Sequence, residues 1–259
     1  MQADLRNKVA LVTGSTSGIG KAIALRFAEN GADVVVNGRT EGPALQVVDQ
    51  IKSLGRQASF DRADIYNYHQ VKEMVRRAVE EFGRIDILVA SGGAAGPPPQ
   101  FFHQIDPSSY MECVQSHLIT RLYCIRAAVD HMMERQGGKI IAITTDAGRT
   151  PTPGESLIGG CAAALVLMTK AIAQELARSG IRINTICTTV TRDTPGWEKA
   201  MSDTSTYLFK LFKKAEEKIP FGMNRPDDIA QLALYLASDD SNQVSGQIFS
   251  VNGGLSFPG

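Results

Sequence analysis

The stretch VTGSTSGIG, residues 12–20, closes a short apolar pattern, KVALV (residues 8–12), and opens a helical one. Its three glycines, Gly14, Gly18 and Gly20, permit a tight turn between a strand and a helix. The first turn of such a helix offers unpaired backbone amides, which bind a pyrophosphate well. Residues 12–20 therefore predict a strand–turn–helix unit that binds a dinucleotide.

Outward from this turn, short strand patterns alternate with longer helical patterns along the whole chain. Strands are predicted at residues 8–14, 33–38, 58–65, 84–91, 139–145, 182–189 and 247–254. Helices are predicted at residues 18–30, 43–54, 67–82, 107–135, 157–179 and 226–238. The strands are mostly continuous apolar runs, typical of a sheet covered on both faces. The pattern predicts one α/β domain over residues 1–259, a doubly wound, seven-stranded parallel sheet with helices on both faces.

The overall charge is balanced, because 27 Lys and Arg residues face 27 Asp and Glu residues. A chain without a net basic field is not expected to bind nucleic acid or an anionic membrane. The four cysteines are widely spaced and form no CxxC pair, so neither a disulfide framework nor a metal site is expected. The N-terminal residues contain no apolar run long enough for a signal peptide or a membrane span. These features predict a cytoplasmic protein.

Several motifs together resemble the short-chain dehydrogenase/reductase family over nearly the whole length. They are TGxxxGIG at residues 13–20, GRIDILVASGG at 83–93, GIRINTI at 180–186 and RPDDIAQLALYLASDDSNQVSGQIFSVNGG at 225–254. The resemblance implies a Rossmann fold that binds NAD(H) or NADP(H). It also implies a tetramer packed through the two long helices, predicted here at residues 107–135 and 157–179.

The cofactor preference in such folds depends on the end of the second strand, where NAD-binding proteins carry a carboxylate for the ribose hydroxyls. Here the residues are Asn37, Gly38 and Arg39. The Arg39 cation suits a 2′-phosphate, which favours NADP(H) over NAD(H); the alternative is a solvated surface arginine.

The predicted cofactor-binding residues extend from the first turn to the fourth strand. The family sequence N-N-A-G is replaced by Ala90-Ser91-Gly92-Gly93, so both asparagine amides are missing and weaker binding is expected. The predicted set is Gly14, Ser15, Ser17, Gly18, Ile19, Gly20, Arg39, Asp64, Ile65, Ser91 and Gly92.

The family's proton relay is changed in three of its four positions. The resemblance places Thr145 at the serine position, which keeps a hydroxyl. Ile158 stands at the tyrosine position, Ala162 at the lysine position and His117 at the asparagine position. Ile158 and Ala162 are one helical turn apart, so an apolar wall is expected where the family has its proton donor.

Two functions follow as alternatives. In the first, the chain binds NADP(H) but is a non-catalytic or partner subunit, in a homotetramer or in a heteromer with an active paralogue. In the second, it is an active NADP-dependent carbonyl reductase or alcohol dehydrogenase. Thr145 would then act with Glu155, His117 or a bound water as the proton donor.

A variable lid over the substrate is expected at residues 190–222. Within it, Leu208, Leu211, Phe212 and Ala215 form an apolar helical stripe among lysines. This pattern fits either a cover for an anionic substrate such as an acyl thioester or a plain amphipathic surface helix. The identity of a small-molecule substrate is left open.

Overall fold

The seven predicted strands form one parallel sheet. The structure is a computed structural model, and it describes residues 3–93 and 96–257. The strand order is β3-β2-β1-β4-β5-β6-β7, and each neighbouring pair is parallel. The bounds are β1 Val9–Val12, β2 Asp33–Asn37, β3 Ala58–Asp61, β4 Ile87–Ala90, β5 Gly138–Thr145, β6 Ile181–Thr188 and β7 Ile248–Val251. The order reverses between β1 and β4, so the doubly wound Rossmann prediction is confirmed.

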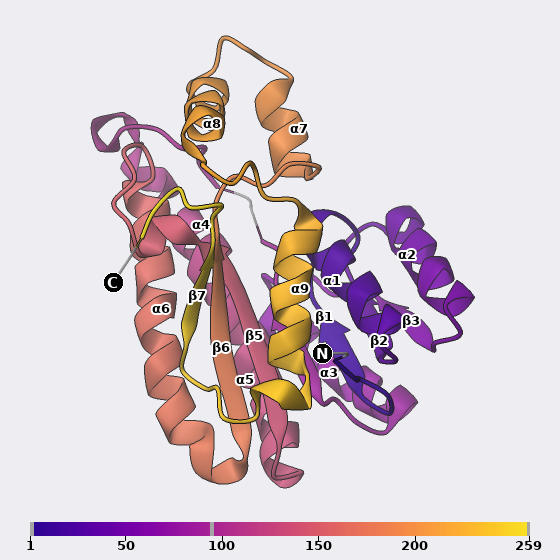
Figure 1. Cartoon of the computed structure of the whole chain (residues 1–259). Helices are drawn as coiled ribbons and strands as arrows, with labels where there is room; N and C mark the ends of the chain where they lie inside the picture. Colours follow the sequence, from indigo (N-terminus) through magenta and orange to yellow (C-terminus); the bar gives the residue numbers. More distant parts are fainter. Residues whose placement is uncertain (1–2, 94–95, 258–259) are drawn as a thin grey trace.

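Helices cover both faces of this sheet (Figure 1). One hydrophobic cluster packs α1 (Gly18–Glu29), α2 (Glu41–Ser53) and α9 (Pro226–Ala237) on one face. A second cluster packs α3 (Tyr68–Phe82), α5 (Thr120–Glu134) and α6 (Ser156–Leu176) on the other. Along β1, Ala10 and Val12 belong to the first cluster and Leu11 to the second, as the alternation of side chains in a strand requires.

The predicted helix at residues 107–135 is not one regular helix. It consists of the 3₁₀ turn η2 (Pro107–Ser109), α4 (Tyr110–Val114), the π-helical segment η3 (Gln115–Ile119) and α5. The Ser116 carbonyl accepts hydrogen bonds from the Thr120 hydroxyl, at 3.0 Å, and from the Arg121 guanidinium. Side chains that insert into the helical hydrogen-bond ladder widen it, and this accounts for the π turn.

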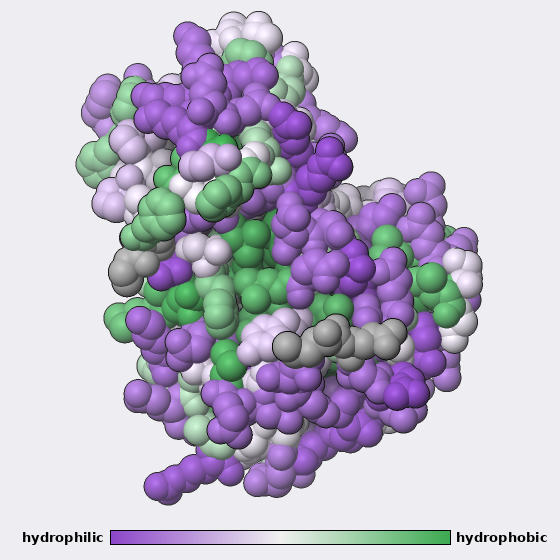
Figure 2. All heavy atoms as spheres, viewed as in Figure 1, coloured by the Kyte–Doolittle hydropathy of each residue, from purple (hydrophilic) through white to green (hydrophobic). Residues whose placement is uncertain are grey.

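Two short helices project beyond the carboxyl ends of the strands. They are α7 (Pro195–Met201) and α8 (Tyr207–Lys218), within the region expected to be variable (Figure 1). Figure 2 shows hydrophobic side chains gathered below this projection. The remaining 3₁₀ turns are η1 (Phe102–Gln104), η4 (Asp146–Gly148), η5 (Ala177–Ser179) and η6 (Asp239–Ser241).

Helix α6 with η5, Ser156–Ser179, is the one described helix that is long and apolar enough to cross a membrane. The core helix of a soluble protein meets the same test, and α6 buries Leu165, Ala173 and Leu176 at the sheet. Its outer side is exposed and includes Ala163 and Leu167, of which 69% is accessible, before the polar Lys170 and Gln174.

We expect Gly14→Ala to destabilise the protein much more than Gly55→Ala. Both glycines have positive φ, +62° and +76°, so alanine at either costs about 1–2 kcal/mol of backbone strain. A Cβ at Gly14 would also lie 2.6 Å from the Gly92 Cα, whereas a Cβ at Gly55 has nothing within 4 Å. Overpacking adds about 1–3 kcal/mol at Gly14 only. Equal losses of unfolding free energy in urea titrations would contradict the close contact.

Candidate active site

One large cavity, about 1260 Å³, opens at the carboxyl ends of the strands. Its wall includes the first turn, the ends of β2, β4, β5 and β6, and the α7–α8 region. This edge, beside the reversal of strand order, is where open parallel sheets bind their ligands. The cavity is large enough for a dinucleotide together with a second molecule.

The glycine turn forms a cradle at one end of the cavity. A Cβ at Gly20 would lie 2.4 Å from the Gly14 carbonyl oxygen, and a Cβ at Gly38 would lie 2.4 Å from the Thr16 methyl group. Ser17, the N-cap of α1, makes no side-chain capping bond, so the helix terminus leaves its amides available to a ligand. The cradle thus fits a pyrophosphate on backbone donors.

The structure brings ten of the eleven predicted cofactor-binding residues to this cavity. Ser15 is the exception, because its side chain is fully buried away from the cavity wall. Its hydroxyl donates to the Val12 carbonyl at 2.6 Å and accepts from the Asn37 amide at 3.1 Å, which joins β1 to β2. The residues that do line the cavity are Gly14, Ser17, Gly18, Ile19, Gly20, Arg39, Asp64, Ile65, Ser91 and Gly92.

The end of β2 presents a cation and no carboxylate. Asn37 is buried, and its side-chain amide donates to the Asp61 and Ala63 carbonyls at 3.1 and 3.0 Å. Arg39 is exposed and makes no ion pair or hydrogen bond within residues 3–93 and 96–257. Its guanidinium therefore remains available at the mouth of the cavity.

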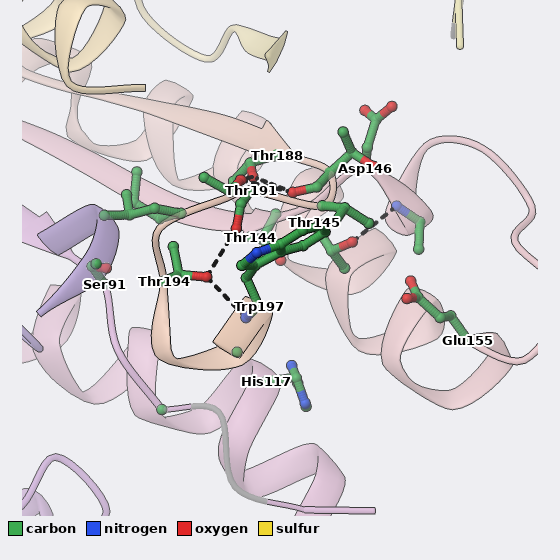
Figure 3. Close-up of a pocket in the computed structure, with 18 of the residues that line it drawn as sticks. Ser91, His117, Thr144, Thr145, Asp146, Glu155, Thr188, Thr191, Thr194 and Trp197 are labelled. Carbon is green, nitrogen blue, oxygen red and sulfur yellow. Dashed lines mark hydrogen bonds between the residues drawn. The ribbon is translucent and has the colours of Figure 1, made fainter. Parts of the chain in front are cut away.

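At the opposite end, polar side chains from three elements face the same space (Figure 3). Thr145 ends β5, and its hydroxyl accepts from the Ala147 amide at 3.3 Å. Glu155 is the N-cap of α6, and His117 lies in the π-helical segment η3. Asp146, the neighbour of Thr145, is buried and accepts from Ser250, Asn252 and Ser256, so it joins the end of β5 to β7 and to the segment after β7.

The ionisation of Glu155 and His117 is shifted in opposite directions. Burial raises the pKa of the Glu155 carboxyl, which makes no hydrogen bond or ion pair with any other described side chain or backbone group. Burial, and secondarily the charge of Arg121, lower the pKa of His117 to about 4. At neutral pH the imidazole is uncharged, whereas the carboxyl binds a proton more readily than an exposed glutamate does.

The expected apolar wall of Ile158 and Ala162 is not part of the cavity lining. Ala162 is fully buried against η4, so close that a Cβ at Gly148 would lie 2.6 Å from the Ala162 Cβ. Ile158 is half-buried. The helical spacing placed the two residues on one face correctly, but it could not show that η4 packs against that face.

Helix α8 contributes both lysines and apolar side chains to the cavity. Tyr207 fixes the beginning of α8, since its hydroxyl donates to the Pro153 carbonyl at 3.2 Å and its ring lies 5.2 Å from that of Phe101. The α8 residues that line the cavity are Tyr207, Lys210, Leu211, Phe212, Lys214, Ala215 and Lys218. Leu208 of the predicted stripe does not line it.

Arg121 is a cavity residue that the sequence reasoning missed. It lies in the first turn of α5, and only 8% of it is exposed. The sequence did offer a signal for this residue, because Arg121 follows His117 by one helical turn. Among the described residues, no group of three or more His, Cys, Asp or Glu could hold a metal ion.

Comparisons with known proteins agree with this geometry. Residues 14–256 match the family model described as enoyl-(acyl carrier protein) reductase. The chain is 36% identical to the (2S)-[(R)-hydroxy(phenyl)methyl]succinyl-CoA dehydrogenase subunit BbsD of Thauera aromatica, covering 98% of both chains. It is 32% identical to the 3-oxoacyl-[acyl-carrier-protein] reductase FabG of Staphylococcus epidermidis, covering 96% of this chain and 99% of the relative.

A solved 7α-hydroxysteroid dehydrogenase, complexed with NADH and 7-oxo glycochenodeoxycholic acid, is similar throughout. Its TM-score is 0.88 at 30% sequence identity, with 98% of this chain and 96% of that chain covered. The likeness therefore includes both the sheet and the segments that surround the cavity.

We expect Glu155→Gln to stabilise the protein increasingly as pH rises. The folded-state pKa is raised above its ordinary value of 4.5, so below that value the carboxyl is protonated in both states and the substitution changes little. As pH rises through the folded-state pKa, the carboxyl must ionise in its desolvated position in the native protein. The free energy of unfolding then falls by about 1.4 kcal/mol for each unit by which the folded-state pKa exceeds the unfolded-state pKa. Thermal unfolding between pH 4 and pH 9 measures the effect.

The exposed Glu175→Gln, on the same helix, is the matched control. It should show no comparable gain across this pH range. The same pH dependence in both variants would mean that Glu155 is not desolvated.

Proposed function

Since the chain belongs to the short-chain dehydrogenase/reductase family, we propose that it is an NADP(H)-dependent oxidoreductase acting on an acyl thioester, with Glu155 as the proton donor. The observation that carries this proposal is the half-buried carboxyl of Glu155, which has no partner among the described residues and shares a cavity with Thr145. A bound nicotinamide would supply or accept the hydride.

NADP(H) is proposed over NAD(H) because of the charges at the end of β2. Asn37 has no charge to repel a phosphate, and Arg39 is unpaired in the part of the chain that the structure describes. The glycine cradle would hold the pyrophosphate, and Arg39 would bind the 2′-phosphate through charge-assisted hydrogen bonds.

The proton route would pass through Thr145 and Glu155, which line the same cavity. The Thr145 hydroxyl would donate a hydrogen bond to the carbonyl oxygen and orient it. The raised pKa of Glu155 lets the carboxyl carry a proton closer to neutral pH, where it could deliver that proton to the oxygen. His117, neutral at this pH, would act as a hydrogen-bonding group and not as the charged acid.

An acyl thioester is proposed as substrate from the relatives and the charge of α8. The names of two relatives specify a CoA thioester and an acyl-carrier-protein thioester. Lys210, Lys214 and Lys218 recur every four residues, and all three line the cavity. They would meet the phosphates of such a carrier, while Leu211 and Phe212 would cover its apolar portion. Residues 190–222 would then act as the lid.

We expect Arg39→Ala to weaken NADPH binding about 10- to 100-fold and to leave NADH binding unchanged. Loss of a charge-assisted contact to a phosphate accounts for the size of the effect, and NADH lacks that phosphate. Isothermal titration calorimetry measures both affinities. Arg178→Ala, in η5, is the control and should change neither. A parallel loss for both dinucleotides would argue against the phosphate contact.

We expect Glu155→Gln to lower kcat for reduction of a 3-oxoacyl-CoA by roughly 10²–10⁴-fold, the usual contribution of a positioned acid. NADPH affinity should be retained, because Gln preserves the shape of the side chain. Glu175→Gln provides the control for a charge removed elsewhere on α6. Undiminished turnover in the Glu155 variant would rule out this residue as the donor.

The second candidate is a partner subunit without chemistry of its own. Ile158 and Ala162 cannot transfer protons, the BbsD relative is named as a subunit, and the outer side of α6 exposes the apolar Leu167. This side of α6, with α5, would join a homotetramer or a heteromer with an active paralogue. A chain that binds NADPH but reduces no thioester by itself in the preceding assay would have this function.

A further inference from the structure

The guanidinium of Arg121 is buried among neutral groups at the catalytic end of the cavity. Its Nε donates to the Ile143 carbonyl at 3.3 Å. Its Nη1 donates to the Gly93 carbonyl and the Thr120 hydroxyl, each at 3.1 Å, and to the Ser116 carbonyl. Within residues 3–93 and 96–257, Arg121 has no carboxylate partner, and Nη2 makes no hydrogen bond. Two N–H donors of a cation are therefore unused.

This arrangement is unfavourable unless a ligand completes it. Only 8% of Arg121 is exposed, and removal of a charge from water without an opposite charge costs free energy. Burial lowers the pKa of Arg121 to about 10, so the guanidinium still carries its proton at neutral pH. A cavity wall with a permanent cation and two free donors is suited to an oxygen-rich ligand.

Arg121 acts electrostatically on the α6 residue next to the position where the family resemblance implies a lysine. Ala162 occupies the position where the family resemblance implies a lysine that holds the nicotinamide ribose. The adjacent Cys161 thiol lies within the electrostatic field of Arg121, and α6 contacts η3, the segment directly before α5. The π turn of η3 is bound by Arg121 through the Ser116 carbonyl, and this fixes the direction of the guanidinium.

We propose that Arg121 replaces, from α5, the lysine that α6 lacks, and that its Nη2 binds the ribose hydroxyls at the nicotinamide end of the dinucleotide. The proposal rests on the dinucleotide binding proposed above. It assigns Arg121 to the cofactor and not to proton transfer. Nε and Nη1 hold Gly93, Ser116 and Ile143 in place, while Nη2 is free for the ribose.

The first test compares two ligands that share the adenosine end. Arg121→Met should weaken NADPH binding about 10-fold or more, the usual effect of losing hydrogen bonds to a charged group. It should leave the affinity for 2′,5′-ADP unchanged, because that ligand lacks the nicotinamide ribose. Arg121→Lys, which keeps the charge, should recover part of the NADPH affinity. Calorimetric titration gives all three values.

The outcomes separate this proposal from the proposed function. If Arg121→Met binds NADPH as tightly as the unchanged protein, Arg121 does not hold the ribose, and NADP(H) binding itself still stands. If both ligands weaken equally, Arg121 acts only by shaping the fold, and the proposal fails. If the unchanged protein binds neither ligand, the proposed cofactor is wrong and this inference falls with it.

The second test compares Tm and NADPH affinity in variants of position 162. Ala162→Lys should lower Tm more than Ala162→Met, because both overpack the contact with η4 but only the lysine adds a second cation. In the Arg121→Met background the extra loss of Tm for Ala162→Lys over Ala162→Met should shrink, and Ala162→Lys should restore part of the NADPH affinity. Strictly additive changes in Tm and in NADPH affinity would show that positions 121 and 162 do not share one site. This result would overturn the proposal that Arg121 replaces the lysine.

Discussion

The contact between two glycine backbones, at Gly14 and Gly92, is the constraint on which the cavity depends. A Cβ at Gly14 would lie 2.6 Å from the Gly92 Cα, so the turn after β1 and the segment after β4 approach as closely as two chains can. Thr13 strengthens the approach, because its hydroxyl donates to the Ser91 carbonyl at 2.7 Å. This contact brings the amides of α1, the end of β2 and the end of β4 to one cavity.

Much of this arrangement was predictable, since it depends on local patterns that repeat along the chain. Apolar strand runs and glycine spacing predicted the parallel sheet, and ten of the eleven proposed cofactor residues do line the cavity. Ser15 was misplaced because the strand pattern cannot show whether a hydroxyl turns to a ligand or to the neighbouring strand. The π turn and the burial of Ala162 depend on side chains distant in the sequence, so helical periodicity missed them.

The end of the cavity at Thr145 contains the buried Arg121 and the half-buried Glu155, two ionisable groups of opposite sign that are not paired with each other. A direct ion pair between the two side chains would reduce the free-energy cost of removing them from water. Instead, Arg121 donates to carbonyls, and Glu155 has no partner in the described part of the chain. A ligand in the cavity can supply the hydrogen bonds that such groups do not make with protein atoms. His117 lines the same cavity, and burial, together with the charge of Arg121, lowers the pKa of its imidazole so that it is neutral.

The desolvated carboxyl of Glu155 also bears on whether the chain is catalytically active. A subunit with a purely structural role would gain stability from Gln at position 155, since an amide carries no charge to desolvate. A carboxyl retained there despite its raised pKa is consistent with a use for the proton. Ile158 and Ala162 stand where the family resemblance implies a tyrosine and a lysine, and neither side chain can supply a proton or a positive charge. Under the proposals above, Glu155 would supply the proton and Arg121 the positive charge, and both residues line this cavity.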